Sequence, residues 1–400
     1  MTLFLLTQLY DPLSCHTVEV NEAMKICIIS NSHLSNDVRL YYKLGISLAK
    51  QHEVYVITTS GVVNDIHNPF QVVVDSESPW RALRIIAQKV NQIKPELLIC
   101  VEPLTLLVAW RLKKKLGLRV IFDVHEFFAY SFSERFIWPI RFPFFLAYQT
   151  GLKILIRIAD GIWTVNREVG KQLLGKRVDH KAVVLPNYPV KNVWDYVCDV
   201  PGALEQVCQM DFDLIYIGGL TKDRGIFKLL KLASLLKHDF PMLKILVLGK
   251  FFSPETEKQF NQSINSYNLN AVIYYHEWIP AEKIGLLLKR CRFGLWLFNP
   301  RNRRMKLTTP LKVLEYLAAG LPVITVKTPL MKALIEHNGL GICSGFQARA
   351  IAKATAKMLH LSSSEYEDMH RKCLEIAETR FNWEALEPQL FQSLNKVMAK

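Results

Sequence analysis

The chain is longer than one hydrophobic core usually serves, since domains cluster at roughly 100 to 200 residues, so its 400 residues predict two domains. Half of the residues are hydrophobic and 22% are charged, a balance that is typical of an ordered globular chain and excludes long disordered arms. The formal net charge of +14 attracts anions such as nucleotide phosphates, lipid headgroups or nucleic acid, and charge alone does not distinguish among them.

The cysteines and the apolar first residues of the sequence indicate in which cellular compartment the protein is expected. Eight cysteines are scattered without a Cys-x-x-Cys pair, which argues against a disulfide framework or a structural zinc site and fits a reducing cytoplasm. The start, MTLFLLTQL, carries no Lys or Arg, so we expect no export signal and interpret residues 1–23 as a leader outside the core. No apolar run approaches the ~20 residues of a membrane-spanning helix. We therefore expect a cytoplasmic protein whose membrane contact is at most peripheral, on the inner face of the cytoplasmic membrane.

From Met24 onward, β-branched runs alternate with helical patterns, as in parallel sheets covered by helices on both faces. The first half predicts strands at residues 25–30, 53–58, 97–101, 119–123, 161–165 and 182–185. A helix capped by Asn36 should follow the first of these strands. The second half predicts strands at 214–218, 244–248, 271–275, 293–297, 322–326 and 341–343. We predict an N-terminal domain over 24–190, a linker over 191–210, a C-terminal domain over 211–380 and a final helix over 381–400.

A glycine-rich turn follows the first expected strand of the second half. Gly218 and Gly219 end that strand, and a helix should begin near Arg224 and Gly225. Glycines let the backbone approach a ligand, a helix N-terminus supplies free N–H groups, and Lys222 and Arg224 add positive charge, so the turn suits an anion. An ordinary strand-to-helix turn with exposed basic residues explains the same pattern.

The segment KLTTPLKVLEYLAAGLPVITV, residues 306–326, predicts a helix followed at once by a buried strand. Thr308 or Thr309 can cap this helix, Pro310 can start it and Gly320 can end it.

Glu315 lies inside the same helix, beside the apolar Val313, Leu314 and Leu317. A carboxylate in such surroundings needs a partner, and the two hydroxyls of a ribose would serve as hydrogen-bond donors. A salt bridge with Lys312 would satisfy it as well.

This segment resembles the C-terminal signature of the family 4 (group 1) retaining glycosyltransferases of the GT-B fold, a Pro-x-Lys-x-x-Glu-Tyr run followed by Ala-Ala-Gly-x-Pro-Val. Ordered matches extend the resemblance over residues 24–400. They are the Asp37 and Arg39 pair, Asp123-Val124-His125-Glu126 after a strand, Leu185-Pro186-Asn187 before the linker, the 218–225 loop and Asn299. The resemblance implies an α/β architecture of two Rossmann-like doubly wound parallel-sheet domains facing a central cleft, with the C-terminal helix packing back on the N-terminal domain.

The resemblance also implies roles for residues at matching positions. Glu315 would hold the donor's ribose and Arg224 its diphosphate. Phosphate oxygens would meet the backbone of Gly218, Gly219, Thr309, Pro310 and Leu311. Across the cleft, His125 would face the transferred sugar, and Asp37, Arg39 and Glu126 would belong to the acceptor side. Fixed positive charge and N–H dipoles suit the departure of a nucleoside diphosphate from an oxocarbenium-like centre. In a retaining enzyme of this kind, the leaving phosphate itself would accept the acceptor's proton.

Two positions depart from the family pattern. Members commonly have a first glutamate eight positions before the second, where this chain has Leu307, and an arginine after the first glycine of the phosphate loop, where it has Gly219. Both departures are consistent with an altered or catalytically silent site. Nearby cations would either replace the missing charge or form a solvated basic loop; they are Arg301, Arg303, Arg304 and Lys306.

No metal or other cofactor is expected. A zincin motif beginning at His125-Glu126 would need a histidine at position 129, which is Ala129. A hydrogen-bonded structural histidine also explains His125. Asp37 and Arg39 are explained equally well as first-turn and helix-surface residues.

The segment RFIWPIRFPFFLAYQTGLKILIRIADGIW, residues 135–163, interleaves aromatic residues with Arg135, Arg141, Lys153 and Arg157. An apolar surface edged by cations can lie in a lipid headgroup layer. A core helix packed on the first sheet is the alternative, and the family resemblance favours the membrane.

We therefore predict transfer of a hexose-type sugar, with retention, from a UDP-, GDP- or ADP-sugar to a glycan or lipid-linked acceptor, in cell-surface polysaccharide or glycolipid biosynthesis. The alternatives are a nucleotide-sugar epimerase and a catalytically silent binding subunit at the membrane. No nucleic-acid partner is expected, because only the net charge favours one.

Overall fold

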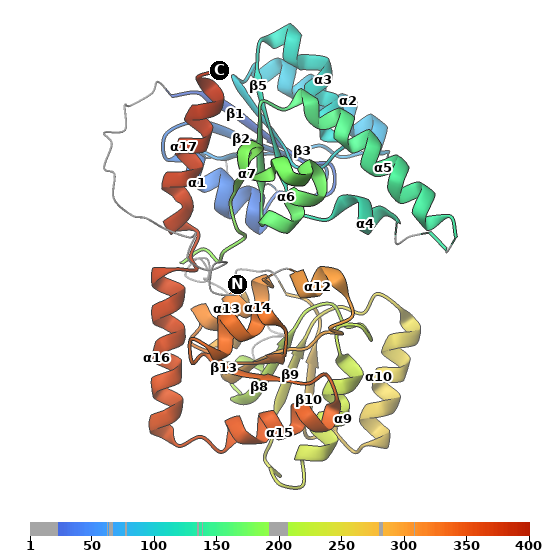
Figure 1. Ribbon diagram of the computed structural model, residues 1–400, viewed down its shortest axis with the longest axis vertical. Coiled ribbons are helices and arrows are strands. Elements are labelled where there is room, and N and C mark those ends of the chain that lie inside the picture. Colours follow the sequence, from blue (N-terminus) through green and yellow to red (C-terminus); the bar gives the residue numbers. More distant parts are fainter. Residues whose placement is uncertain are drawn as a thin grey trace.

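Two parallel sheets form the centres of two α/β domains, which are stacked along the long axis of the molecule (Figure 1). The computed structural model describes residues 23–61, 63, 67–76, 78–133, 136–137, 139–191, 207–279, 283–307 and 309–400. Over these residues the first sheet has seven strands and the second has six, and all strand pairs are parallel. The predicted fold class is confirmed. The predicted leader, apart from residue 23, and most of the predicted linker lie outside the described residues.

The first sheet has the strand order β3-β2-β1-β4-β5-β6-β7. Its strands are β1 (Lys25–Ile29), β2 (Glu53–Thr58), β3 (Phe70–Val73), β4 (Leu97–Cys100), β5 (Arg119–Val124), β6 (Gly161–Thr164) and β7 (Ala182–Val184). Its helical segments are the π-helix η2 (Val38–Gly45), α1 (Ile46–Ala49), α2 (Pro79–Ile93), α3 (Thr105–Leu116), α4 (Phe128–Ser133), α5 (Arg141–Leu155), η3 (Ile156–Ile158), α6 (Arg167–Leu174), η4 (Gly175–Arg177) and α7 (Val178–Lys181). Sequence patterns predicted each of these strands except β3, a short strand at the edge of the sheet.

The second sheet has the strand order β10-β9-β8-β11-β12-β13. Its strands are β8 (Phe212–Ile217), β9 (Ile245–Leu248), β10 (Ile273–His276), β11 (Cys291–Trp296), β12 (Val323–Val326) and β13 (Gly341–Ser344). The helical segments of this half are α9 (Ile226–Leu236), α10 (Pro254–Ser266), α11 (Ile284–Leu288), α12 (Arg303–Leu307), α13 (Leu311–Ala318), α14 (Pro329–Met331), η6 (Lys332–Glu336), α15 (Ala348–Leu359), α16 (Ser363–Thr379), η7 (Glu384–Leu386) and α17 (Glu387–Met398). Sequence patterns predicted each strand of this sheet.

Alternate residues of β1 bury themselves on opposite faces of the first sheet, as the period of a strand requires. Ile26 and Ile28 belong to a core shared with η2 and α17, whereas Cys27 and Ile29 belong to a core shared with α2 and α3. All four are fully buried. Burial on both faces explains why these strands are nearly continuous apolar runs in the sequence.

The helix after β1 begins one residue later than predicted. Its N-cap is Asp37 and not Asn36, because the Asp37 carboxylate accepts hydrogen bonds from the backbone N–H of Arg39 (2.8 Å) and of Leu40 (3.1 Å). The cap satisfies N–H groups that have no partner within the helix.

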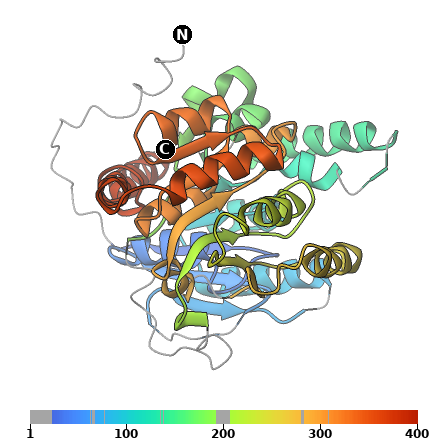
Figure 2. The same ribbon diagram turned by 90° about the horizontal axis from the view of Figure 1, so that it is seen from below.

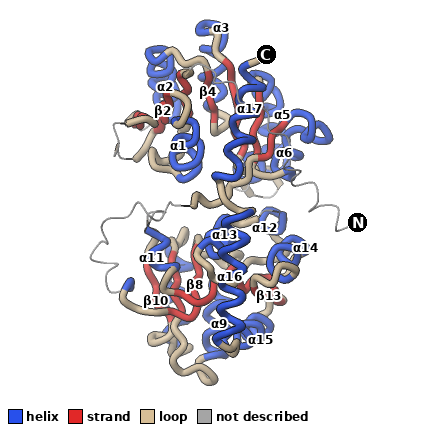
Figure 3. Tube along the Cα trace, turned by 90° about the vertical axis from the view of Figure 1, so that its left-hand side faces the viewer, coloured by secondary structure: helices blue, strands red, loops and turns tan. Residues whose placement is uncertain are grey.

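The C-terminal helix α17 packs back on the first domain, as predicted (Figures 1 and 3). Trp163 of β6 donates its indole N–H to Ser393 Oγ at 2.9 Å. Gly161 leaves room for α17, since a Cβ there would lie 2.5 Å from Val397 Cγ2. Trp383, just before η7, likewise donates to Ser47 Oγ at 2.9 Å. The last residues of the chain therefore belong to the core of its first domain.

Helices α4 and α5 form a hairpin that projects from the side of the first domain (Figures 1 and 2). Stacked rings join the two arms: Phe132 lies 4.7 Å from Tyr148 and Phe136 lies 4.0 Å from Phe144, centroid to centroid. Within α5 only Gln149 and Leu152 are buried. The core-helix interpretation of residues 135–163 is therefore wrong for α5, because most of its apolar side chains stand on the surface. In the described part of the chain no helix is long and apolar enough to span a membrane.

Candidate active site

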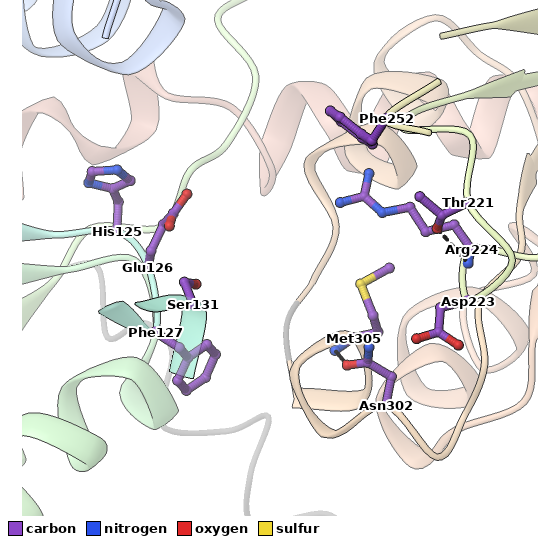
Figure 4. Close-up of a pocket in the computed structure, with 10 residues that line it drawn as sticks. All are labelled: His125, Glu126, Phe127, Ser131, Thr221, Asp223, Arg224, Phe252, Asn302 and Met305. Carbon is purple, nitrogen blue, oxygen red and sulfur yellow. Dashed lines mark hydrogen bonds between the residues drawn. The ribbon is translucent and has the colours of Figure 1, made fainter. Parts of the chain in front are cut away.

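A cavity of about 440 Å³ lies between the two domains, beyond the carboxyl ends of their strands. The first domain contributes His125, Glu126, Phe127 and Ser131. The second domain contributes Thr221, Asp223, Arg224, Phe252, Asn302 and Met305. In Figure 4 the first set lies on one side of the cavity and the second set on the other. Ligands of open α/β sheets bind at this end of the strands, so the cavity is the candidate active site.

Arg224 is positioned by the turn between β8 and α9. Gly218 (φ +155°) and Gly225 (φ +77°) adopt conformations that favour glycine, and Gly225 is the N-cap of α9. The Tyr216 hydroxyl donates a hydrogen bond to the Arg224 carbonyl at 3.0 Å. The guanidinium runs along the glycines, since its Nη1 would lie 3.1 Å from a Cβ placed on Gly219. A cation beside glycine backbone is an arrangement that suits a phosphate group.

Phe252 occupies the space in front of Gly219. A Cβ on Gly219 would lie 2.5 Å from the Phe252 ring, so any side chain at this position would have to displace the ring. Phe252 nevertheless remains 70% exposed on the cavity wall. The chain thus presents an aromatic ring where the family pattern has a second arginine.

Glu315 is held beside the central strands of the second sheet by its neighbour Tyr316. The Tyr316 hydroxyl accepts a hydrogen bond from the Ile217 backbone N–H (2.9 Å) and donates to the Leu295 carbonyl (3.3 Å). Its ring packs on Gly294, where a Cβ would lie 2.3 Å away. These contacts join α13 to β8 and β11 and fix the position of the Glu315 side chain.

The Glu315 carboxylate is buried and only partly satisfied. Lys312 Nζ lies 2.7 Å from Glu315 Oε2, so the salt bridge that the spacing allowed is present. That ammonium does not approach with hydrogen-bond geometry, and Oε2 has no hydrogen-bond partner among the described residues. Lys312 Nζ also lies 5.1 Å from the centre of the Trp278 ring, which is half exposed. An additional donor, such as a ribose hydroxyl, would complete the partners of Glu315.

The start of α13 differs from the prediction. The N-cap is Pro310, and no side chain caps the helix, so Thr309 does not have the capping role expected of it. Thr308 lies outside the described residues. Gly320 follows the helix with φ +75°, as expected for the residue after a helix C-cap. The first turn, beginning at Leu311, directs its N–H groups toward the carboxyl end of the sheet.

His125 follows β5 and reaches the cavity from the first domain. Both ring nitrogens are buried and lack a hydrogen-bond partner among the described residues, although part of the residue is exposed. Burial lowers the pKa of His125; the charge of Asp123 opposes this shift, and His33 and Arg39 add to it. The imidazole is therefore neutral at physiological pH, with one donor and one acceptor available to a ligand.

Arg39 is not the helix-surface residue that its position predicted. It is buried and bonds both carboxylate oxygens of Asp123, with Nε to Oδ2 and Nη2 to Oδ1 at 2.7 Å each. Burial alone would raise the pKa of Asp123, but the charge and hydrogen bonds of Arg39 outweigh it and lower the pKa. Asp37 caps the same helix. The two residues that were expected on the acceptor side thus have structural partners next to the site.

The Leu185-Pro186-Asn187 run is joined to the same helix. Arg39 Nη1 donates to the Leu185 carbonyl at 3.3 Å, and the buried Lys43 Nζ donates to Asn187 Oδ1. Burial lowers the pKa of Lys43 to about 7, and the charge of Arg39 adds to this shift. These bonds fix the chain where it leaves the first domain.

A second carboxylate cluster lies at the carboxyl end of the first sheet. Glu102 follows β4, and its Oε1 accepts hydrogen bonds from His33 Nδ1 (2.5 Å), Ser30 Oγ (2.6 Å) and Ser32 Oγ (2.8 Å). Its Oε2 accepts from the Asn31 backbone N–H at 3.0 Å. Sequence patterns did not predict a role for any of these residues.

Residues 206–378 match the model of the family described as glycosyl transferases group 1. This match covers the second domain, which is therefore similar to the group 1 glycosyltransferases. Two curated relatives are the UDP-glycosyltransferase TURAN of Arabidopsis thaliana, 29% identical over 106 residues, and the chitobiosyldiphosphodolichol beta-mannosyltransferase of Debaryomyces hansenii, 26% identical over 110 residues. The matched stretches cover 26% and 27% of this chain and 22% of each relative.

Solved structures share the architecture of this chain over nearly its whole length. Anabaena HepE in complex with UDP and glucose superposes with a TM-score of 0.67 at 14% identity, over 93% of this chain and 100% of that one. Sucrose-phosphate synthase from Thermosynechococcus elongatus superposes with a TM-score of 0.68 at 17% identity, over 94% and 99%. At these identities the likeness shows the fold alone.

The predicted site residues fall into three sets. His125, Glu126 and Arg224 line one cavity. Gly218 and Gly219 lie beside Arg224, and Glu315 with Thr309, Pro310 and Leu311 lies on α13 and just before it; none of these is among the residues that line the cavity. Asp37 is the N-cap of η2, and Arg39 lies within η2. Exposed Phe252 and the Glu102 cluster were missed. The sequence places Phe252 in the loop after β9 and Glu102 in the loop after β4, but the contacts of each appear only in the folded structure.

Proposed function

We propose that this glycosyltransferase moves a hexose-type sugar from a UDP-, GDP- or ADP-sugar to a glycan or lipid-linked acceptor. The observation that carries the proposal is the pairing, across one cavity, of Arg224 beside a glycine backbone with the neutral His125. When the bond between the sugar and the diphosphate breaks, negative charge develops on the leaving oxygens, and a fixed guanidinium stabilises it. His125 would contact the sugar from the opposite wall.

The nucleoside would be held by the second domain. Glu315 has an unsatisfied carboxylate oxygen at the carboxyl end of this domain's sheet, and two ribose hydroxyls are matched donors for it. The solved neighbour HepE binds UDP and glucose with the same fold, which supports a sugar nucleotide as the donor. No cofactor besides the donor is proposed.

For the acceptor we propose a lipid-linked glycan. This acceptor implies a role in cell-surface polysaccharide or glycolipid biosynthesis. One relative has a dolichol-linked substrate in its name, and the exposed hairpin of α4 and α5 adjoins the residues that line the cavity. We propose that the protein is cytoplasmic and peripheral, with this hairpin on an anionic membrane surface. The sequence resemblance implies that the configuration at the anomeric carbon is retained. A side chain of the first domain that took the proton of the acceptor hydroxyl would instead give inversion.

Thermal shift of the purified protein with a panel of nucleotide sugars tests the proposal, because a ligand stabilises the folded state in proportion to the logarithm of its concentration above Kd. The best donor is then incubated with lipid-linked acceptors, and the release of nucleoside diphosphate and the glycosylated product are measured. Binding of the donor without transfer of its sugar would favour a catalytically silent binding subunit. The departures from the family pattern at Leu307 and Gly219 are the reason to consider this alternative. Conversion of the donor into an epimer would favour an epimerase, and no binding at all would refute a nucleotide-sugar site.

A further inference from the structure

The carboxyl ends of three adjacent strands bring Glu102, His33 and His125 together. In the sheet order β1 lies next to β4 and β4 next to β5, and these residues follow β4, β1 and β5 respectively. Glu102 and His33 are 69 residues apart in the sequence yet share a hydrogen bond. The rings of His33 and His125 meet edge to face, with centroids 4.9 Å apart. The pair of Glu102 and His33 therefore adjoins the cavity wall that faces Arg224.

The hydrogen bonds of Glu102 determine which ring nitrogen of His33 carries the proton. The carboxylate already accepts from Ser30, Ser32 and the Asn31 backbone. An ionised carboxylate is only an acceptor, so His33 Nδ1 must carry the proton in their bond. In the neutral imidazole Nε2 is then the proton acceptor. The Glu102 side chain is 9% exposed and that of His33 is 24% exposed, so the carboxylate lies behind the ring and the ring remains accessible.

We propose that His33, oriented by Glu102, is the general base that takes the proton of the acceptor hydroxyl. The inference rests on the proposed function. The acceptor oxygen forms a bond to the anomeric carbon as its proton passes to His33 Nε2. The bond from that carbon to the diphosphate oxygen breaks, and its electron pair leaves with the nucleoside diphosphate beside Arg224. Buried Glu102 stabilises the imidazolium that forms.

The direct displacement also predicts the stereochemistry. His33 contacts His125, which lines the first-domain wall of the cavity, and the leaving group would lie beside Arg224 on the second-domain wall. Attack and departure on opposite faces of the sugar invert the anomeric carbon. The product should therefore have the opposite anomeric configuration to the donor, in contrast to the retention that the sequence resemblance implies.

The surroundings of His33 raise its pKa. Burial alone would lower its pKa, but the hydrogen bond and charge of Glu102, with the charges of Asp37 and Glu126, outweigh burial and raise the pKa above 6.5. The adjacent ring of His125 stays neutral because its own pKa is lowered. Only neutral His33 accepts a proton, so kcat should rise with pH through the raised pKa and level off above it.

The experiment measures product configuration by proton NMR and compares the parent with His33→Asn, which keeps an amide donor for Glu102 but has no titratable group. We expect an inverted product from the parent. In the variant, kcat should fall about 100- to 10,000-fold and the rising limb of the pH profile should disappear. Calorimetric affinity for the nucleoside diphosphate should stay nearly unchanged, because His33 lies in the other domain. His180→Asn, an exposed histidine of the same domain, is the matched control and should behave as the parent.

Glu102→Gln provides a second readout, since removal of the charge lowers the pKa of His33. In Glu102→Gln the rising limb of the pH profile of kcat should move to lower pH while kcat itself falls. A merely structural role of Glu102 would not produce this shift. A retained configuration in the parent's product, or an unchanged pH profile in His33→Asn, overturns the inference and leaves the proposed function standing. Absence of nucleotide binding and transfer in the parent overturns both.

Discussion

Replacing Phe142 and Leu146 by serine should detach the protein from anionic vesicles without unfolding it. These side chains of α5 are 63% and 54% exposed. Large apolar side chains offer roughly 150 to 200 Å², so the pair presents about 200 Å² to the surroundings. At about 25 cal/mol per Å², full burial in the lipid interface would contribute up to about 5 kcal/mol. Because serine keeps part of this area and burial is incomplete, we expect a loss of about 2 to 4 kcal/mol, or roughly thirty- to a thousandfold in partitioning.

Charge should make the proposed membrane-docking surface on α5 prefer anionic lipid. Residues 136–159 contain Arg141, Lys153 and Arg157 and no Asp or Glu. Each cation near the surface contributes about 1 kcal/mol, and salt screens the attraction over about 10 Å at 0.1 M. Binding should therefore weaken as salt is raised, and substitution of the three cations by glutamine should lower it further. Arg135, which was predicted to belong to this set, lies outside the described residues.

Co-sedimentation with vesicles of anionic and of neutral lipid measures the effect, beside the free energy of unfolding in urea. Met242→Ser, which removes an 80% exposed apolar side chain from the second domain, is the matched control and should bind as the parent does. Exposed substitutions should change the free energy of unfolding by less than about 0.5 kcal/mol. Equal binding of the parent and the double variant, or loss of several kcal/mol of stability in the variant, would refute the docking surface.

Two further predictions concern the first domain. His125→Ala should leave nucleotide affinity nearly intact and lower turnover, because its side chain reaches the cavity from the other domain; a parallel loss of affinity and stability would make it a structural residue. Arg39→Ala should destabilise the fold by about 3 to 5 kcal/mol, because it leaves Asp123 buried without its partner, and an unchanged urea midpoint would contradict this.

Most strands could be predicted because burial on both faces produces continuous apolar runs, which a sequence displays directly. The edge strand β3 was missed, since Phe70–Val73 contains Gln71 and is mostly only partly buried, so it does not form a continuous apolar run. The surface position expected for Arg39 was wrong for another reason. Its partner Asp123 is 84 residues away, and helix periodicity contains no information on a partner in another element.

A site residue could be predicted from the sequence where its role depends only on neighbours in the same helix or strand. Glu315 could be recognised because a carboxylate among apolar neighbours needs a partner wherever the helix packs. The Glu102 cluster could not, because its meaning depends on the adjacency of β1 and β4 in the sheet. Phe252 was also missed, since its relation to Gly219 appears only when the loops after β8 and β9 are side by side.

Binding of a nucleoside diphosphate by the second domain, through Arg224 and Glu315, is the claim on which the proposed function depends. Calorimetry of the parent with UDP, GDP and ADP identifies the best ligand, and Arg224→Ala and Glu315→Gln are then titrated with it. A charge-assisted contact contributes roughly 1.5 to 3 kcal/mol, so each variant should bind about ten- to a hundredfold more weakly. If both variants bind the best nucleotide as tightly as the parent does, the donor site lies elsewhere.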